Sequence, residues 1–417
     1  MTYSRLRAIL SHYWSWVKLI PRINSAKKNY VSRLEMVRKK KNIGEKIKVL
    51  FLVNENAKWK CQSVYDAMRV GDVFDPYIVL TRADIDWGLS RAEFEAKIQE
   101  NYSFFASRGI ECLLGVINGE PIDLRHFKPD VVFYQHPWEI APIQNPEEVS
   151  KFALTCYVPY YLVCFESPWM DSHEYLHKFV WRYMVISETW KCFFDNRRHG
   201  FPIAGEIVGI GHPMLDQYSS AHDAVQKKDV IIYAPHWSIE TAWGENFSTF
   251  LTTGRVMLEY AKKHTEYKWC FKPHPTLRHA LIQTSGWSVA DIDGYYQEWE
   301  LLGEMCLSGD YPPKFMESYA MITDSSSFLM EYSAINRPLI RLVSKKCLYQ
   351  PARPTQELFN SFYNVKTIEE LYSTLHTVLE LRQDPKRGMR EKAIRGLGLC
   401  CRGVGEDIAH YINRQIG

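Results

Sequence analysis

Short apolar runs that alternate with helix-like segments constrain the fold of this chain more than any other feature of its sequence. Five runs in the first half are almost continuously apolar, as expected of strands buried on both faces. They lie at residues 48–53, 75–80, 131–134, 154–158 and 182–186. Helical patterns occupy 58–70 and 91–107 between them. This alternation predicts a parallel sheet in a doubly wound α/β domain.

The same pattern restarts after a polar stretch at 219–229. Further strands are predicted at 230–235, 268–273, 319–324 and 338–342, and helices at 249–264, 367–382 and 386–414. A chain of 417 residues is too long for one ordinary core. We therefore predict a basic amphipathic helical arm at 1–46, one Rossmann-like α/β domain at 47–220, and a second one with a helical tail at 221–417. Ligands of such domains bind beyond the carboxyl ends of the strands, which predicts a site in a cleft that the two domains face.

The N-terminal arm differs from the rest of the chain in its charge. Residues 1–46 carry twelve basic and two acidic side chains, a formal charge of +10, which leaves −7 for the remainder of a chain at +3. A basic arm on a neutral-to-acidic body argues against nucleic acid as the main ligand. Apolar residues from Leu6 to Ile20 recur at helical spacing, and Pro21 is expected to end that helix. Such a helix fits an anionic membrane surface, but also the enzyme's own surface or a second subunit.

Location and redox state follow from what the sequence lacks. It has no apolar run of membrane-spanning length and no signal-peptide pattern, so we expect a cytoplasmic protein, peripheral to the inner face of the plasma membrane if the arm binds lipid. The ten cysteines include no CxxC pair, which indicates reduced thiols rather than a zinc site or a disulfide framework.

Polar clusters follow several predicted strands of the second half. Ser325, Ser326 and Ser327 come between a strand and an apolar helix, where N–H groups at a helix N-terminus favour a phosphate, although simple N-capping would also explain serines there. Glu331 falls one to two turns further on, within reach of ribose hydroxyls. The remaining candidates for substrate binding or catalysis are His212, His236, Lys272 and His274. His274 lies between two prolines, and a cationic pair with Lys272 would suit a pyrophosphate.

The first half offers two candidate bases. His136 follows the predicted strand at 131–134 and titrates near neutrality, so it fits a base best, and Glu166 is second. A buried histidine bonded to backbone is the alternative for His136. The chain contains no GxGxxG, Walker A or HExxH pattern, so dinucleotide, P-loop and zinc-protease functions are disfavoured, and neither a metal nor a cofactor is expected.

The order of three motifs resembles the CDP-glycerol glycerophosphotransferase family, the polymerases and primases of teichoic acids and related capsular polymers. These motifs are the strand end from Tyr233 to Trp237, Lys272-Pro273-His274-Pro275, and the stretch from Thr323 to Pro338. The resemblance implies a GT-B fold and metal-independent transfer, in which a hydroxyl of a polysaccharide or lipid-linked chain attacks the β-phosphorus of CDP-glycerol and CMP leaves. It further implies that His274 holds the pyrophosphate, that the three serines hold phosphate oxygens and that Glu331 holds the ribose.

One departure and two alternatives accompany this resemblance. The family's His-Gly-Thr motif is missing from the first half, where residues 156–161 read Cys-Tyr-Val-Pro-Tyr-Tyr, so His136 is expected to supply the base from another loop. Ribitol phosphate or another polyol phosphate would use the same donor contacts. The alternatives are a GT-B glycosyltransferase that uses a nucleotide sugar in capsule or lipopolysaccharide synthesis, and a membrane-associated scaffold that retains the fold.

Overall fold

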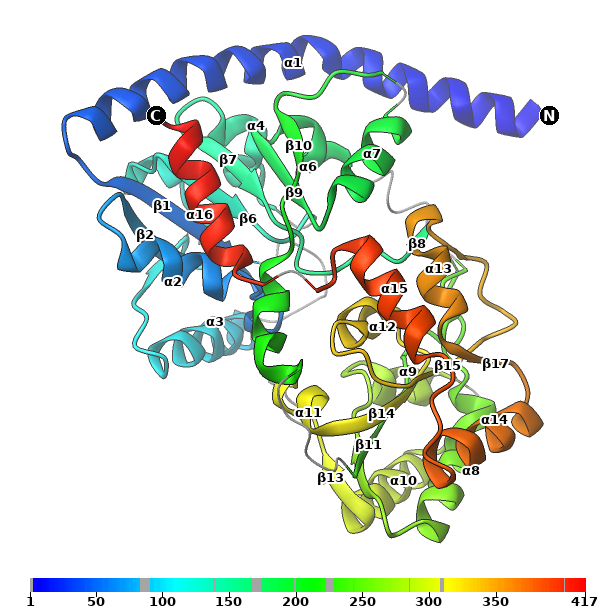
Figure 1. Ribbon diagram of the computed structural model, residues 1–417. Helices are drawn as coiled ribbons and strands as arrows, with labels where there is room; N and C mark the ends of the chain where they lie inside the picture. Colours follow the sequence, from blue (N-terminus) through cyan, green and yellow to red (C-terminus); the bar gives the residue numbers. More distant parts are fainter. Residues whose placement is uncertain are drawn as a thin grey trace. The chain divides into compact units, whose positions relative to one another are not determined.

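The computed structural model describes residues 3–82, 91–137, 140–166, 174–198, 200–222, 229–242, 244–284, 286–307, 311–400 and 402–417. Contacts divide the chain into two compact units (Figure 1). Unit 1 comprises Met1–Tyr161, Pro168–Asp216 and Cys401–Gly417, and unit 2 comprises Leu162–Ser167 and Gln217–Cys400. The predicted domain boundaries at 46/47 and 220/221 stay predictions. The contact units differ from them, because they place the arm and the end of the chain with unit 1, and Leu162–Ser167 with unit 2.

Unit 1 is built on a seven-stranded sheet with the order β10-β9-β7-β6-β1-β2-β3, in which every neighbouring pair is parallel. The strands are β1 (Ile47–Val53), β2 (Phe74–Leu80), β3 (Cys112–Leu114), β6 (Val131–Tyr134), β7 (Leu154–Tyr157), β9 (Arg182–Val185) and β10 (Glu206–Gly209). A separate hairpin joins β4 (Val116–Ile117) and β5 (Glu120–Pro121). The helices are α1 (Tyr3–Asn42), α2 (Gln62–Val70), α3 (Arg91–Ala106), α4 (Pro146–Val149), α6 (Glu174–Phe179), α7 (Glu188–Arg197) and α16 (Val404–Gln415), with short turns η1 (Asn56–Lys58), η2 (Leu124–Phe127), η3 (Pro142–Gln144) and η4 (Pro213–His222), the last of which runs into unit 2.

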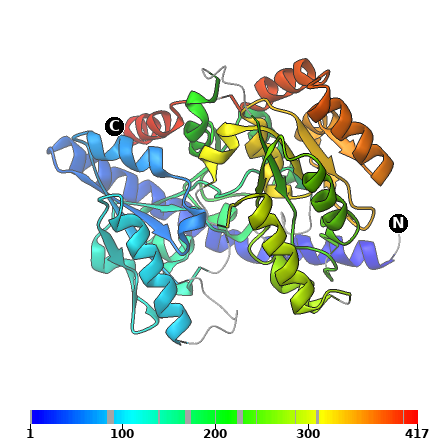
Figure 2. The same ribbon diagram turned by 90° about the horizontal axis from the view of Figure 1, so that it is seen from below.

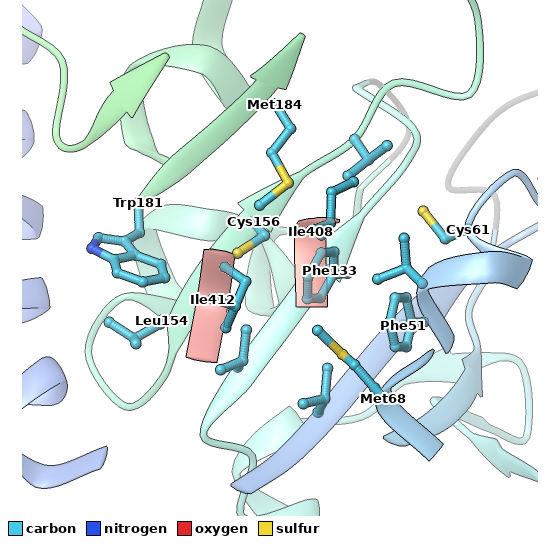
Figure 3. Packing of buried hydrophobic residues seen from close by; sticks show 14 of the residues in the cluster. Phe51, Cys61, Met68, Phe133, Leu154, Cys156, Trp181, Met184, Ile408 and Ile412 are labelled. Atoms are coloured by element: carbon cyan, nitrogen blue, oxygen red, sulfur yellow. The ribbon is translucent and has the colours of Figure 1, made fainter. Parts of the chain in front are cut away.

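The core of unit 1 forms between the sheet and its helices. Figure 3 shows Phe51, Phe133 and Cys156 on neighbouring strands beside Ile408 and Ile412 of α16. The rings of Phe51 and Phe133 stack with their centroids 4.7 Å apart. Each fully buried side chain of this size contributes about 1.5–3 kcal/mol through the hydrophobic effect. The strands predicted from apolar runs are therefore the strands that carry the core.

Helix α1 continues through Pro21, so the prediction that Pro21 ends the helix is wrong. A buried stripe along α1 explains why the helix persists, since packing compensates for the hydrogen bond that a proline removes. The stripe consists of Trp16, Ile23, Ala26, Tyr30 and Val37. The Tyr30 hydroxyl also hydrogen-bonds to Thr155 Oγ1 and the Phe179 carbonyl, each at 2.5 Å. The arm therefore packs on unit 1, whereas the side chains of residues 1–13 lie outside the described part.

Helix α16 closes the core of unit 1 from the far end of the sequence. Val404, Ile408, Ala409 and Ile412 are buried, and the helix packs against α2. The Asp216 carboxylate accepts hydrogen bonds from the N–H groups of Val404 and Gly405, at 3.0 and 2.9 Å. One long helix was predicted for 386–414. The structure has two, α15 (Arg387–Leu397) in unit 2 and α16 in unit 1, separated by Gly398 and Gly403 in the left-handed region.

Unit 2 contains a six-stranded sheet with the order β13-β12-β11-β14-β15-β17, again parallel throughout. The strands are β11 (Val230–Ala234), β12 (Lys268–Phe271), β13 (Gly303–Met305), β14 (Ser318–Thr323), β15 (Leu339–Leu342) and β17 (Tyr363–Val365). The helices are α8 (Phe250–Lys263), α9 (Leu277–Gln283), α10 (Val289–Leu302), α11 (Pro312–Glu317), α12 (Ser326–Ser333), α13 (Gln356–Asn360), α14 (Ile368–Leu375) and α15, with turns η5 (Arg353–Thr355) and η6 (His376–Glu380).

Aromatic side chains fill one face of this second sheet. Phe271 stacks on Trp299 of α10 at 4.9 Å, and Tyr233 lies 5.8 Å from Phe271. Helices α8 and α10 pack together over this face (Figure 2). A short segment from the first half of the sequence also belongs to this unit, because β8 (Phe165–Glu166) pairs antiparallel with β16 (Gln350–Pro351). The two parallel sheets confirm the predicted α/β fold class.

Across the described ranges, no helix combines the length and apolar character that crossing a membrane requires. The cysteines in the same part of the chain are free thiols.

Candidate active site

The carboxyl edge of the unit 2 sheet carries most of the predicted site residues. His236 follows β11, His274 follows β12, and Ser325 follows β14. These three strands are neighbours, since β11 pairs with both β12 and β14. The structure thus brings together side chains that are up to 89 residues apart in the sequence, as the strand-end pattern predicted.

Asp324 fixes the backbone of this edge. Its carboxylate accepts hydrogen bonds from the His236 N–H, the Thr249 N–H and the Thr249 hydroxyl, at 2.6, 2.6 and 2.9 Å. Burial raises the pKa of Asp324 to about 6, although these three donors favour the charged form. The carboxylate therefore ties the loop after β11 and the start of α8 to the end of β14.

His236 is buried and neutral in this arrangement. Its Nδ1 accepts from the Ser238 N–H at 3.2 Å and lies 2.7 Å from the Ser238 hydroxyl. Burial, followed by the nearby charge of His274, holds the pKa of His236 well below its ordinary value. A neutral ring that accepts at Nδ1 carries its proton on Nε2, so His236 can donate to an anion.

His274 presents a second imidazole next to the first. The two ring centroids are 5.2 Å apart. The Thr276 N–H donates to Nδ1 of His274 at 3.2 Å, which directs Nε2 to other partners. His274 is half-exposed, whereas His236 is buried. Two imidazoles that both use Nδ1 for local bonds offer a paired set of Nε2 donors.

Lys272 occupies the same strand end but packs against aromatic rings. Its ammonium lies 4.7 Å from the ring centroid of Tyr311 and 5.4 Å from that of Phe328. It also contributes to lowering the pKa of Cys306 to about 7, after the larger effect of the hydrogen bond from Cys270. Lys272 therefore places a buried positive charge at this edge.

The predicted serines form the start of α12. Ser325 is the N-cap residue, and its hydroxyl lies 3.2 Å from that of Ser327. The Cys164 thiol, from the segment that carries β8, donates to the Ser326 carbonyl at 3.2 Å. The Ser325 side chain makes no capping hydrogen bond, and the first N–H groups of an α-helix have no partner within the helix.

Glu331 lies inside α12 and is buried between two tyrosines. The Tyr218 hydroxyl donates to Oε1 at 2.5 Å and the Tyr311 hydroxyl donates to Oε2 at 2.8 Å. Burial, and then the charge of Glu331, raises the pKa of both phenols well above their ordinary value. The phenols therefore stay protonated and hold the carboxylate in one orientation.

In unit 1, His136 lines a pocket at the carboxyl edge of the sheet. The pocket is lined by side chains from the ends of β1, β2 and β6 and from the turn η3. They are Leu52, Asn54, Thr81, Arg82, Tyr134, Gln135, His136, Ile140, Ala141 and Gln144. Nδ1 of His136 lies 3.1 Å from Asn54 Nδ2, and Nε2 lies 3.3 Å from Lys58 Nζ. Both of these contacts of His136 are to side chains.

Two other predicted residues, His212 and Glu166, form hydrogen bonds with backbone groups. His212 is buried, donates from Nε2 to the Pro159 carbonyl at 2.5 Å and accepts at Nδ1 from the Met214 N–H at 3.3 Å. Burial lowers the pKa of His212 to about 4. Glu166 belongs to unit 2, where its Oε1 accepts from the Arg353 N–H at 3.3 Å. Each of these two residues therefore has a hydrogen bond to a backbone group.

The described ranges contain no group of three or more histidine, cysteine or carboxylate side chains that could hold a metal ion.

Residues 180–394 match the family described as CDP-glycerol:poly(glycerophosphate) glycerophosphotransferase, over just more than half of the chain. The chain belongs to this family. As a glycerophosphotransferase, it is an enzyme that transfers glycerol phosphate from CDP-glycerol. The matched span includes every predicted donor-side residue, whereas His136 and Glu166 precede it.

Solved structures show how widely the fold of this glycerophosphotransferase is shared. The wall teichoic acid polymerase TagF aligns over 100% of this chain and 98% of its own, with 14% identity and a TM-score of 0.53. MnaA of S. aureus with UDP aligns over 88% and 97%, with 14% identity and a TM-score of 0.52. UDP-GlcNAc 2-epimerase of Neisseria meningitidis aligns over 89% and 99%, with 14% identity and a TM-score of 0.50. No curated protein is similar enough in sequence to count as a relative.

Several residues of the site were not predicted from the sequence. Asn54 and Lys58 follow a predicted strand, so the strand-end pattern could have found them. Tyr218 and Tyr311 are separated from Glu331 by 113 and 20 residues and follow no predicted strand, so no local signal marks them.

Proposed function

We propose that unit 2 binds CDP-glycerol at the carboxyl edge of its sheet. The observation that carries this proposal is the pair of imidazoles, His236 and His274, held side by side with both Nδ1 atoms engaged. Their Nε2 atoms donate to the pyrophosphate, together with Lys272 and the first N–H groups of α12 beside Ser325, Ser326 and Ser327. Glu331, oriented by two tyrosines, accepts from the ribose hydroxyls.

The transfer itself needs positioning, charge neutralisation and a base. A hydroxyl oxygen of the acceptor attacks the β-phosphorus of CDP-glycerol and forms a new phosphodiester bond. The bond between that phosphorus and the bridging oxygen breaks, and CMP leaves with the electron pair. His136 takes the hydroxyl proton on Nε2. Charge that develops on the phosphoryl oxygens is stabilised by imidazole and helix N–H donors in the role that a metal ion has elsewhere.

The acceptor is proposed to be a hydroxyl of a cell-surface polysaccharide or of a lipid-linked chain. Support comes from the family, whose description names poly(glycerophosphate), and from TagF, which is described as a wall teichoic acid polymerase. A TagF variant has also been solved after a soak with CDPG.

Calorimetric titration in EDTA tests the donor site. Wild-type protein is expected to bind CDP-glycerol and CMP. His274→Ala is expected to weaken CDP-glycerol binding roughly 10- to 100-fold, because loss of a hydrogen bond to a charged group costs about 1.5–3 kcal/mol. His279→Ala is the matched control, because His279 lies exposed on the adjacent helix α9. Preference for UDP-glucose, or binding only after metal is added, would favour sugar transfer instead.

We also propose that α1 holds the enzyme against an anionic membrane on the cytoplasmic face. Lys18, Lys27, Lys28 and Lys39 are exposed on α1 and do not belong to its buried stripe. Each exposed basic group near an anionic surface contributes about 1 kcal/mol.

Vesicle co-sedimentation tests this location. Replacement of these four lysines by glutamate is expected to abolish pelleting with vesicles that contain phosphatidylglycerol, while the buried stripe keeps α1 docked. Deletion of the arm is a poorer test, because it would uncover the core of unit 1. Equal pelleting of wild type and the charge-reversed variant would contradict the proposal.

A further inference from the structure

The segment that follows β1 places two polar side chains against His136. Asn54 approaches Nδ1 at 3.1 Å and Lys58 approaches Nε2 at 3.3 Å. Glu55 forms an ion pair with Lys58 at 2.9 Å. The Lys58 ammonium also lies 5.7 Å from the ring centroid of Tyr160, which is itself 5.7 Å from the ring of His136.

The protons available to these groups determine how they bond. An ammonium group only donates, so Nε2 of His136 must accept from Lys58. A neutral imidazole carries a single ring proton, which then resides on Nδ1. Nδ1–H needs an acceptor, and the Asn54 carboxamide supplies one when a half-turn brings Oδ1 to the ring. Only this arrangement makes both contacts hydrogen bonds.

The backbone of this segment is fixed from two sides. The side chain of Asn101 on α3 donates to the Asn54 carbonyl at 3.0 Å and accepts from the Asn56 N–H at 2.8 Å. Gln135, next to the base, accepts from the Lys60 N–H at 2.7 Å. The loop after β1 and the loop after β6 are thus locked together, which holds Asn54 and Lys58 at the imidazole.

We propose that Asn54 and Lys58 are positioning residues for His136. Asn54 fixes the ring proton on Nδ1. Lys58 keeps the lone pair of Nε2 unprotonated until an acceptor hydroxyl takes the place of the Lys58 ammonium. The inference rests on the proposed role of His136 as the base. A cation beside the ring disfavours a second positive charge before the acceptor arrives. Glu55, which already pairs with Lys58, retains the displaced ammonium, so that Nε2 is open to the hydroxyl proton.

The tautomer of His136 provides a direct test in the full-length protein. Long-range ¹H–¹⁵N imidazole spectra of wild type without acceptor are expected to show a protonated Nδ1 and an unprotonated Nε2, with the signals assigned by their loss in His136→Gln. In Asn54→Ala the proton is expected to redistribute toward Nε2. A wild-type ring protonated on Nε2, or on both nitrogens, at pH 7.5 would overturn the inference.

Kinetics give a second, independent readout. Asn54→Ala and Lys58→Met are each expected to lower kcat roughly 10- to 100-fold. This is a smaller reduction than the roughly 10²- to 10⁴-fold expected when the base itself is removed. The KM for CDP-glycerol is expected to stay unchanged. Asn54→Asp, which keeps an acceptor at Nδ1, and Lys58→Arg are expected to recover part of the loss. Asn56→Ala and Lys97→Met are the matched controls, since Asn56 bonds to the exposed Glu100 and Lys97 is exposed on α3.

The two proposals fail in different ways. Full activity of His136→Ala would show that His136 is not the base, and it would overturn this inference as well. Loss of activity in His136→Ala, with wild-type kcat in Asn54→Ala and Lys58→Met, would overturn only the positioning roles. Hydrogen exchange in unit 1 that matches wild type shows that each variant is folded.

Discussion

Asp324 orders the backbone at the proposed donor site, the carboxyl edge of the unit 2 sheet. Its carboxylate holds the backbone of His236 and of Thr249, so the geometry of the first imidazole depends on a residue 88 positions later in the chain. Burial makes the charged form of this carboxylate costly, which is why its pKa is raised to about 6 from an ordinary value of 3.8.

A pH-dependent stability follows from Asp324. Because the folded pKa is raised, the folded state binds the proton more tightly than the unfolded state. The stabilisation is complete below about pH 3.8 and is lost as the pH rises through about 6, a change on the order of 3 kcal/mol. The measurement is urea unfolding of unit 2, monitored by hydrogen exchange. The difference in free energy of unfolding between wild type and Asp324→Asn is expected to shrink between pH 4 and pH 7. Asp72→Asn, at an exposed carboxylate, should show no such trend.

The candidate site could be predicted from the sequence where a residue directly follows a strand. His236 and His274 met that condition, because an apolar run fixes the strand and the edge of a parallel sheet collects what comes next. His212 follows strand β10 as well, yet the adjacent backbone at Pro159 uses its Nε2 proton. Such a contact depends on tertiary packing, so no local pattern could distinguish this histidine from the other two.

At the scale of elements, α1 shows how packing overrides a local signal. Proline in a helix interior costs about 3 kcal/mol because it removes a hydrogen bond and clashes with the preceding turn. The buried stripe from Trp16 to Val37 lies on both sides of Pro21 and holds the helix together. The apolar spacing of the stripe can be seen in the sequence, but the surface of unit 1 that the stripe covers cannot.

Pro21→Ala is expected to stabilise α1 locally. Pro21 is exposed, so alanine leaves the packing intact while restoring a backbone donor. Hydrogen exchange of amides between Val17 and Ser25 should slow by roughly tenfold or more, which corresponds to about 1.4 kcal/mol. Unchanged or faster exchange would show that the helix is already strained elsewhere.

The elements missed from the sequence are short or polar. Strands β3, β13 and β17 have three residues each, too few for an alternating or apolar pattern to stand out. Helix α10 mixes acidic and aromatic residues, and its identity as a helix depends on Tyr295 and Trp299 reaching the core of unit 2. The nine strands predicted from almost continuously apolar runs of four to six residues were confirmed, because burial on both faces leaves a strong pattern.

At the scale of the whole molecule, the return of α16 to unit 1 completes that unit's core. Ile412→Ala is expected to destabilise unit 1 by about 2–5 kcal/mol, since Ile412 is fully buried beside Phe133 and Cys156. His410→Ala, an exposed position on the same helix, should change stability by less than about 0.5 kcal/mol. Urea unfolding with hydrogen exchange resolved by unit provides the measurement. Equal effects of the two substitutions would contradict the assigned packing.

The route of the chain also has a consequence for biosynthesis. Residues 217–400 form most of unit 2, and the helix that completes unit 1 is translated after them. A ribosome adds residues in sequence at about 5–20 per second. Unit 2 can therefore finish folding on the ribosome while unit 1, although begun first, waits with Val64 and Met68 of α2 uncovered until α16 emerges. During synthesis, the half of the enzyme that starts first is the last to be finished.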